Sequence, residues 1–129
     1  MEMGIANVRN AREEIAQADY PNIRLFTVKK AVSAAPLSDC TGKWDVCTPQ
    51  TVSADGWGGF SAAGYFFGRE LFRKYGVPIG LIHTSWGGTP AESWTRREVL
   101  AADPDLAGMV STRVSPPIFA GYPGASLNA

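Results

Sequence analysis

The chain has 129 residues, of which 45% are hydrophobic and 19% charged, proportions that are typical of a globular domain with one core. Twelve basic residues balance twelve acidic ones and the charges are scattered, so the sequence carries no electrostatic signature of a nucleic-acid or anionic-membrane partner. No apolar run approaches the roughly 20 residues of a membrane span, and the first residues lack the basic and apolar regions of a signal peptide.

The first predicted elements are a short helix and a strand. Asn10 and Glu13 have the spacing of a capping box, which predicts an Ala-rich helix that continues to about Ala18. Pro21 restricts the residue before it and ends this helix. Residues 23–28 are dense in apolar side chains and predict a strand.

The next segment predicts loops around a second short strand. Residues 29–43 show no sustained periodicity, residues 43–47 alternate as a short strand or turn does, and residues 56–59 form a flexible glycine-rich connection. Two cysteines, Cys40 and Cys47, are too few for a disulfide scaffold and lack the spacing of metal ligands. A disulfide between Cys40 and Cys47 across a short loop remains an alternative, but we favour two small buried thiols.

The strongest predicted helix covers residues 60–75. Ser61 is a candidate N-cap, and Gly76 followed by Pro78 predicts the end of the helix. Gly64 and Gly68 lie inside it and each costs about 1 kcal/mol relative to Ala, so we expect this helix to approach a sheet closely. Apolar side chains recur at helical spacing and predict one buried stripe, made of Phe60, Ala63, Gly64, Phe67, Leu71 and Tyr75.

A short apolar run follows, from Pro78 to His83. Because the run does not alternate with polar residues, it predicts a strand buried on both faces, as in a parallel sheet. The segment Thr89–Glu92 offers a cap, a proline at the first helical position and a glutamate that closes the box, so another helix is expected to begin there. This order of elements predicts an α/β fold. Residues 111–129 show no periodicity and predict loop, disorder or sequence foreign to the domain.

The segment Ser85–Thr89, between that strand and that helix, is the candidate functional loop. Ligands of open parallel sheets bind outside the carboxyl ends of the strands. Gly87 and Gly88 let the backbone approach a ligand, and their N–H groups could face the negative charge of an oxyanion. A tight turn from strand to helix explains the two glycines equally well, and their spacing alone does not decide between the two interpretations.

Ser85 and His83 are the residues to consider for nucleophilic catalysis. The sequence around Ser85 has the second glycine of the Gly-x-Ser-x-Gly nucleophile elbow but not the first. His83 is the only histidine in the chain, and it precedes Ser85 on the same strand face, a placement from which a serine and its base do not usually meet. We therefore expect His83 to be a hydrogen-bonded core residue and Ser85 not to be a nucleophile.

Other chemistry has weak support. Glu92 and Asp45 could act as an acid or a base, but neither has a second carboxylate at a telling spacing. There is no phosphate-binding glycine loop, and we expect no metal site. Trp86 is the tryptophan that we favour for a binding pocket, because it lies in the glycine loop.

Four stretches of the sequence resemble sialate O-acetylesterase-like proteins, which are SGNH hydrolases. The resemblance covers roughly residues 1–105, and it is specific because the four stretches agree in order and spacing. It implies an incomplete three-layer α/β/α domain of the flavodoxin-like type with a mostly parallel sheet over residues 1–105, and an irregular tail over 106–129. The stretches are residues 20–26, 44–49, 60–71 and 76–94.

The resemblance also implies where the catalytic residues of this family belong. The family's nucleophile lies in a Gly-Gln-Ser-Asn-Met-Glu-Met segment, and Met1-Glu2-Met3 looks like the end of it, so the serine is expected just upstream of Met1. The acid–histidine pair and an oxyanion asparagine are expected beyond Ala129. Either Gly87 or Gly88 resembles the glycine whose N–H helps to hold the oxyanion. The candidate substrate-binding residues are Trp86, Thr89 and Glu92.

The implied reaction is hydrolysis of an O-acetyl ester on sialic acid or a related sugar. A serine attacks the acetyl ester, a histidine serves as base and then as acid, and no metal or organic cofactor is needed. An acetyl-xylan or other polysaccharide esterase, and a catalytically silent carbohydrate-binding remnant, are the alternatives. The expected partner is an O-acetylated sugar, with neither nucleic acid nor membrane, and the oligomeric state stays open. An extracytoplasmic location, periplasmic or secreted, is implied by the resemblance, and the chain alone is expected to be inactive.

Overall fold

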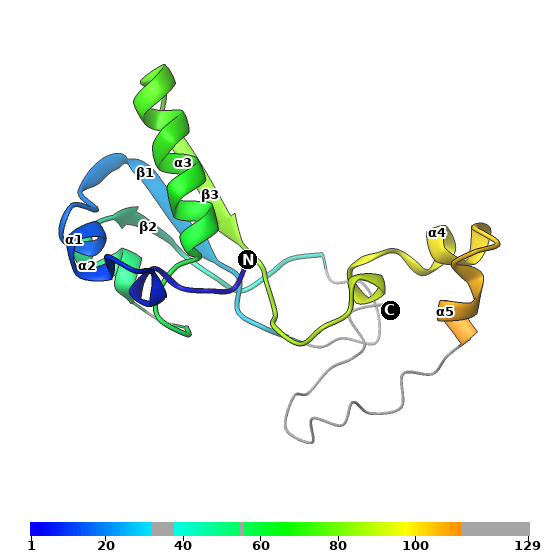
Figure 1. The fold of residues 1–129 in the computed structure, drawn as a ribbon. Helices are drawn as coiled ribbons and strands as arrows, with labels where there is room; N and C mark the ends of the chain where they lie inside the picture. The colour runs from blue at the N-terminus through cyan, green and yellow to red at the C-terminus, as the bar shows by residue number, and fades with distance from the viewer. Residues whose placement is uncertain (32–37, 55, 112–129) are drawn as a thin grey trace. The chain divides into compact units, whose positions relative to one another are not determined.

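The computed structural model describes residues 1–31, 38–54 and 56–111, which belong to two compact units (Figure 1). The first unit consists of residues 1–29 and 40–86, and the second of residues 30–39 and 87–129. Within the described residues no helix is long and apolar enough to cross a membrane. The domain boundary expected at residue 105 stays a prediction.

The first unit contains a three-stranded sheet in the order β2-β1-β3. The central strand β1 (Tyr20–Thr27) pairs antiparallel with β2 (Trp44–Cys47) and parallel with β3 (Ile79–His83). In the parallel register Leu25 lies opposite Leu81. The α/β class is therefore confirmed, but the described sheet is mixed rather than mostly parallel.

Helix α3 (Ala62–Tyr75) packs on β3 and β1, and both of its predicted ends are confirmed (Figure 1). The side chain of Ser61 accepts a hydrogen bond from the backbone N–H of Gly64 at 3.2 Å. The helix ends at Gly76, which adopts the left-handed conformation with φ 66° and donates its N–H to the Phe72 carbonyl.

The buried face of α3 is not the predicted stripe. Its buried residues are Ala62, Tyr65 and Gly68, whereas Phe67 is 64% exposed and Tyr75 is 60% exposed. Both sides of this helix carry apolar residues, so the helical period alone fits two phases. The small residues mark the phase that the structure adopts, because they let the helix lie close to the strands.

Helix α3 lies close to the sheet at Gly68. A Cβ atom built on Gly68 would lie 2.6 Å from Cδ1 of Leu81, closer than any real packing contact. The close approach expected from the glycines of this helix is thus confirmed at Gly68, and Leu81 fills the space that the missing side chain leaves.

Two shorter helices differ from the sequence prediction. Helix α1 (Ala11–Ala16) forms, but Asn10 makes no side-chain cap and instead donates its Nδ2 to Oε1 of Glu14 at 3.1 Å. The predicted capping box with Glu13 is therefore wrong, because the side-chain oxygen of Asn10 accepts no hydrogen bond from the first turn of the helix. The structure adds a helix that the sequence did not predict, α2 (Pro49–Ser53).

Helix α2 begins at a reciprocal cap between two threonines. Oγ1 of Thr48 accepts from the N–H of Thr51 at 3.2 Å, and Oγ1 of Thr51 accepts from the N–H of Thr48 at 2.8 Å. Pro49 occupies the first helical position, where no N–H is needed. A 3₁₀ segment, η1 (Ile5–Asn7), packs against α1 and α2.

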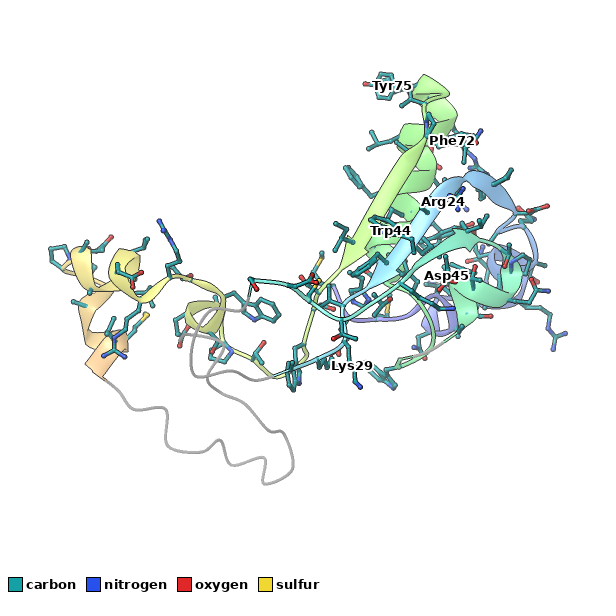
Figure 2. All side chains as sticks on the ribbon, turned by 180° about the vertical axis from the view of Figure 1, so that it is seen from behind. Arg24, Lys29, Trp44, Asp45, Phe72 and Tyr75 are labelled. Atoms are coloured by element: carbon teal, nitrogen blue, oxygen red, sulfur yellow. The ribbon has the colours of Figure 1, made fainter. Side chains whose placement is uncertain are left out.

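The two faces of the sheet differ in exposure. The closed face lies under α3 and is formed by the buried side chains of Ile23, Leu25, Cys47 and Leu81. Figure 2 looks at the molecule from behind, toward the open face. On that face Trp44 is 50% exposed and Ile82 is 64% exposed, so the burial of β3 on both faces that the sequence predicted is wrong for the described chain. The open face consists of Arg24, Phe26, Trp44, Val46, Gly80 and Ile82.

The second unit is helical. It contains the 3₁₀ segment η2 (Ala91–Trp94) and the helices α4 (Arg97–Ala102) and α5 (Ala107–Ser111), and α4 packs against α5. The tail predicted as irregular from residue 106 therefore begins with a helical turn, because the irregular composition starts only after Ser111. Residues 112–129 lie outside the described residues.

The two cysteines are not bridged. Cys47 is buried in the core, and Cys40 is exposed, so the prediction of two buried thiols holds for Cys47 alone. Burial, and after it the negative charge of Asp19, raises the pKa of the Cys47 thiol from its ordinary value of 9.0 to about 11. Cys47 is therefore an inert packing residue at neutral pH.

Candidate active site

His83 is the last residue of β3, at the carboxyl end of the parallel strands. Its carbonyl accepts a hydrogen bond from the N–H of Val28 at 3.0 Å, which fixes its backbone. Its imidazole lies edge-to-face with the ring of Phe60, with ring centroids 5.4 Å apart. Sequence reasoning gave Phe60 no role beyond an apolar stripe, although its place just before the helix cap of α3 puts it beside β3.

Ser85 lies within hydrogen-bond distance of this imidazole. Nε2 of His83 is 2.5 Å from Oγ of Ser85, and both side chains are partly exposed. This contact differs from what the sequence predicted. It forms because residues i and i+2 of an extended segment project to the same side, and residues 84–86 belong to no strand that would hold the hydroxyl away.

The N-terminal residues lie at the start of α3, next to the residues that hold His83. The N–H of Ala62 donates to the carbonyl of Met3 at 2.8 Å, and the N–H of Ile5 donates to the carbonyl of Phe60 at 3.0 Å. In Figure 1 the N-terminus lies beside the carboxyl ends of β1 and β3. One short segment, Phe60–Ala62, therefore contacts both the N-terminal residues and His83.

Glycines allow this close packing of the N-terminal residues. A Cβ atom at Gly4 would lie 2.2 Å from the carbonyl oxygen of Gly58, which accepts a hydrogen bond from the N–H of Ala6 at 2.9 Å. Gly58 and Gly59 have φ values of 83° and 88°, which L side chains rarely adopt. The connection that the sequence predicted as flexible is a constrained turn.

The candidate glycine loop runs from the first unit into the second. Trp86 is the last residue of the first unit, and Gly87 begins the second. Both glycines are exposed, and Gly88 has φ 80°, so the turn requires glycine at position 88 but not at 87. The role of Gly87 and Gly88 as oxyanion donors stays a prediction.

The helix predicted to begin at Thr89 is only the 3₁₀ turn η2, whose N-cap position is Pro90, with no side-chain cap. Oγ1 of Thr89 accepts a hydrogen bond from Nε1 of Trp94 at 2.8 Å. The assignment of Trp86, Thr89 and Glu92 to substrate binding stays a prediction.

The described residues add little support for a metal site or for acid–base catalysis by a carboxylate. Across the described ranges no group of three His, Cys, Asp or Glu side chains could hold a metal ion. Asp45 lies on β2 and is a candidate acid or base, and its Oδ1 pairs with Nζ of Lys43 at 3.0 Å. The chemically suggestive features of the first unit are therefore the His83–Ser85 contact and the N-terminal segment beside it.

No family model matches the chain, but individual relatives do. It is 33% identical over 117 residues to the sialate O-acetylesterases of Rattus norvegicus and Mus musculus, which covers 88% of this chain and 21% of each relative. The chain thus spans about a fifth of the length of the curated relatives that it matches. Among solved structures it is similar to a carbohydrate acetylesterase from Xanthomonas citri, with 36% identity, a TM-score of 0.67, and coverage of 80% of this chain and 23% of that chain.

Proposed function

This chain belongs to the sialate O-acetylesterase-like family of SGNH hydrolases, and from that premise we propose that it is part of an enzyme that removes O-acetyl groups from sialic acid or a related sugar. The proposed partner is the O-acetylated sugar itself. An extracytoplasmic location is part of the same proposal and rests on the family resemblance alone.

The position of the N-terminal residues is the observation that supports the proposal most strongly. Met1-Glu2-Met3 resembles the end of the family's nucleophile segment, and Met3 is hydrogen-bonded at the start of α3. A serine just before Met1 would then lie near the carboxyl ends of β1 and β3. That edge of an open α/β sheet is where ligands bind, and this supports an active site there.

The proposed mechanism divides the catalytic groups between this chain and the rest of the enzyme. The upstream serine attacks the acetyl carbonyl, and a histidine beyond residue 129, oriented by an acid, takes up its proton. Within this chain the N–H groups of Gly87 and Gly88 are proposed to stabilise the tetrahedral oxyanion. His83 is not the proposed base for that serine, because its Nε2 is already bonded to Ser85.

A wider carbohydrate acetylesterase activity is the second candidate. It is favoured by the similarity to the Xanthomonas citri carbohydrate acetylesterase, which at 36% exceeds the identity to the sialate O-acetylesterases. Acetyl-xylan and other acetylated polysaccharides belong to this candidate. A catalytically silent carbohydrate-binding protein is the remaining alternative, and it predicts sugar binding without release of acetate.

The test starts from the complete reading frame around this sequence. We expect an in-frame Gly-Gln-Ser-Asn upstream, and release of acetate by the complete protein from O-acetylated sialic acid, measured beside acetylated xylan. The 129-residue chain alone should show no steady-state turnover of p-nitrophenyl acetate. Stop codons on both sides, or a complete protein that releases no acetate from either substrate, would refute the esterase.

The role of the glycine loop is tested in the same complete protein. Gly88→Ala strains a backbone at φ 80° and should displace the neighbouring donors, lowering kcat by roughly 10- to 1,000-fold with little change in KM. Gly108→Ala is the matched control, because a Cβ atom there meets no other atom within 4 Å. Equal effects of the two substitutions would remove Gly88 from the mechanism.

A further inference from the structure

We propose that Ser85, with His83 as its base, is an acyl-accepting nucleophile in its own right, separate from the serine proposed upstream of Met1. The substrate class is an acetyl or other short acyl ester with a good leaving group. This inference does not rest on the proposed function, because both residues lie in this chain and can be tested without the rest of the enzyme.

The distance between the two side chains is suited to proton transfer. A serine nucleophile needs its base within hydrogen-bond reach, and Nε2 of His83 lies within hydrogen-bond distance of Oγ of Ser85. When Nε2 accepts this hydrogen bond, the hydroxyl proton already points at the base that would remove it. Ser85 is partly exposed, so an ester can reach the hydroxyl.

The base is held in place from two directions. The backbone of His83 is paired with Thr27 and hydrogen-bonded to Val28, and its ring rests against the ring of Phe60. Phe60 is itself 4% exposed and belongs to the core. Fixing the imidazole in this way keeps it aligned with the hydroxyl and lowers the reorganisation that proton transfer requires.

The proposed step is a single acyl transfer. Oγ of Ser85 attacks the ester carbonyl and a bond from Oγ to the acyl carbon forms, while the hydroxyl proton passes to Nε2 of His83. The bond from the carbonyl carbon to the leaving oxygen then breaks, and the leaving group departs as an alcohol or phenol with the proton that His83 returns. The products are acyl-Ser85 and the free alcohol.

The acyl group is expected to remain on Ser85 rather than to turn over. Acyl-serine is an ester of an alkyl alcohol, whose alkoxide leaves far less readily than p-nitrophenolate, so attack by water on it is slower than its formation. The kinetic signature of this situation is a burst without steady-state turnover. The inference is therefore compatible with a chain that does not hydrolyse esters catalytically.

The first experiment locates the acyl group. The 129-residue chain is incubated with p-nitrophenyl acetate, the burst of p-nitrophenolate is recorded, and the acetylated residue is mapped by peptide mass spectrometry. We expect about one equivalent of product per chain, with acetyl on Ser85, and loss of both in Ser85→Ala. The matched control is Ser53→Ala, because the exposed Ser53 hydroxyl bonds only to backbone carbonyls, that of Pro49 at 2.6 Å. Acetyl on other residues, or a burst unchanged in Ser85→Ala, overturns the proposal.

The second experiment tests the base without a substitution. His83 is the only histidine in the chain, so diethyl pyrocarbonate modifies a single imidazole, and hydroxylamine removes the modification. Loss of a general base should lower the acetylation rate of Ser85 by about 100- to 10,000-fold, and hydroxylamine should restore it. His83→Gln should give the same loss in a chain whose circular dichroism matches the wild type. An acetylation rate that survives modification of His83 would show that Ser85 reacts without this base, and the proposed pair would be rejected.

Discussion

The closed and the open face of the sheet carry similar side chains in different surroundings. Leu81 and Ile82 are neighbours on β3, yet Leu81 is 8% exposed beneath α3 while Ile82 is 64% exposed on the other side. The comparison shows that an apolar run tells which side chains can be buried, but not whether a second layer lies in the described chain to bury them. For a chain that spans about a fifth of its curated relatives, an uncovered apolar face is the feature to test.

The open face is partly covered by its own largest side chain. The indole of Trp44 lies next to the ring of Phe26, with centroids 5.1 Å apart, and reaches over Gly80 on β3. A Cβ atom at Gly80 would lie 3.3 Å from that indole, so the glycine makes room for it. The tryptophan therefore shields three strands at once, which reduces the apolar area that this face exposes.

The largest expected contrast comes from truncating the two neighbours on β3. Leu81→Ala should lower the free energy of unfolding by about 2–5 kcal/mol, because it leaves a cavity under Gly68. Ile82→Ala should lower it by less than about 1 kcal/mol, since little area is lost from an exposed site. Urea unfolding followed by circular dichroism measures both variants. Similar losses for the two would mean that the open face is covered in solution.

A pH titration probes the closed face at Cys47. The thiol ionises near 9.0 in the unfolded chain and near pH 11 in the folded one, so above pH 9 the unfolded chain holds fewer protons and rising pH favours unfolding. The stability present below pH 9 should fall by about 2–3 kcal/mol on passing through pH 11. Because lysines and tyrosines also titrate there, the readout is the difference from Cys47→Ala. Parallel pH curves for the two chains would contradict the burial of this thiol.

A smaller effect is expected where α3 meets the closed face. Gly68→Ala places a methyl group against Leu81, which should cost about 1–3 kcal/mol, against a gain of about 1 kcal/mol in helix propensity. The double variant with Leu81→Val removes the clashing carbon and should be less destabilised than the sum of the single changes. Additive losses in thermal unfolding would show that Gly68 does not approach Leu81.

The smallest change in stability is expected from a charge on the open face. Ile82→Lys should alter the free energy of unfolding by no more than about 0.5 kcal/mol, while self-association falls because an exposed apolar patch is interrupted. Sedimentation velocity across a concentration series measures the association. Leu81→Lys is the matched control on the closed face and should not fold. A strongly destabilised Ile82→Lys would place that side chain in a buried contact.

Local features of the fold were predictable from the sequence because local physics decides them. Ser61 and Gly76 mark the ends of α3, where a cap oxygen and a left-handed residue are needed whatever the surroundings. The phase of the helix was not predictable in the same way, since Phe67 and Tyr65 fit apolar stripes on opposite sides. Packing against Leu81 selects between them, and that contact lies between the helix and the strand that follows it, not within the helix.

The candidate site also combines features that follow from the local sequence with features that do not. The glycine loop and the place of His83 at the end of a strand follow from the residues themselves, and the strand is confirmed as β3. The contact between His83 and Ser85 depends on how the chain leaves the strand, and the role of Phe60 depends on a helix that returns to the sheet. The place of Phe60 beside His83 is set by tertiary packing, which residue spacing does not encode.

The parallel pairing of β1 with β3 has a consequence for the order of folding. The antiparallel neighbour β2 and the helices α2 and α3 all lie between these strands in the sequence, so the pairing closes a long loop. Contacts between α3 and β3 span only a short turn and cost less entropy to form. A hairpin of α3 and β3 should therefore assemble first and then dock onto β1, which makes Gly68 and Leu81 early contacts and the register of β1 a late one.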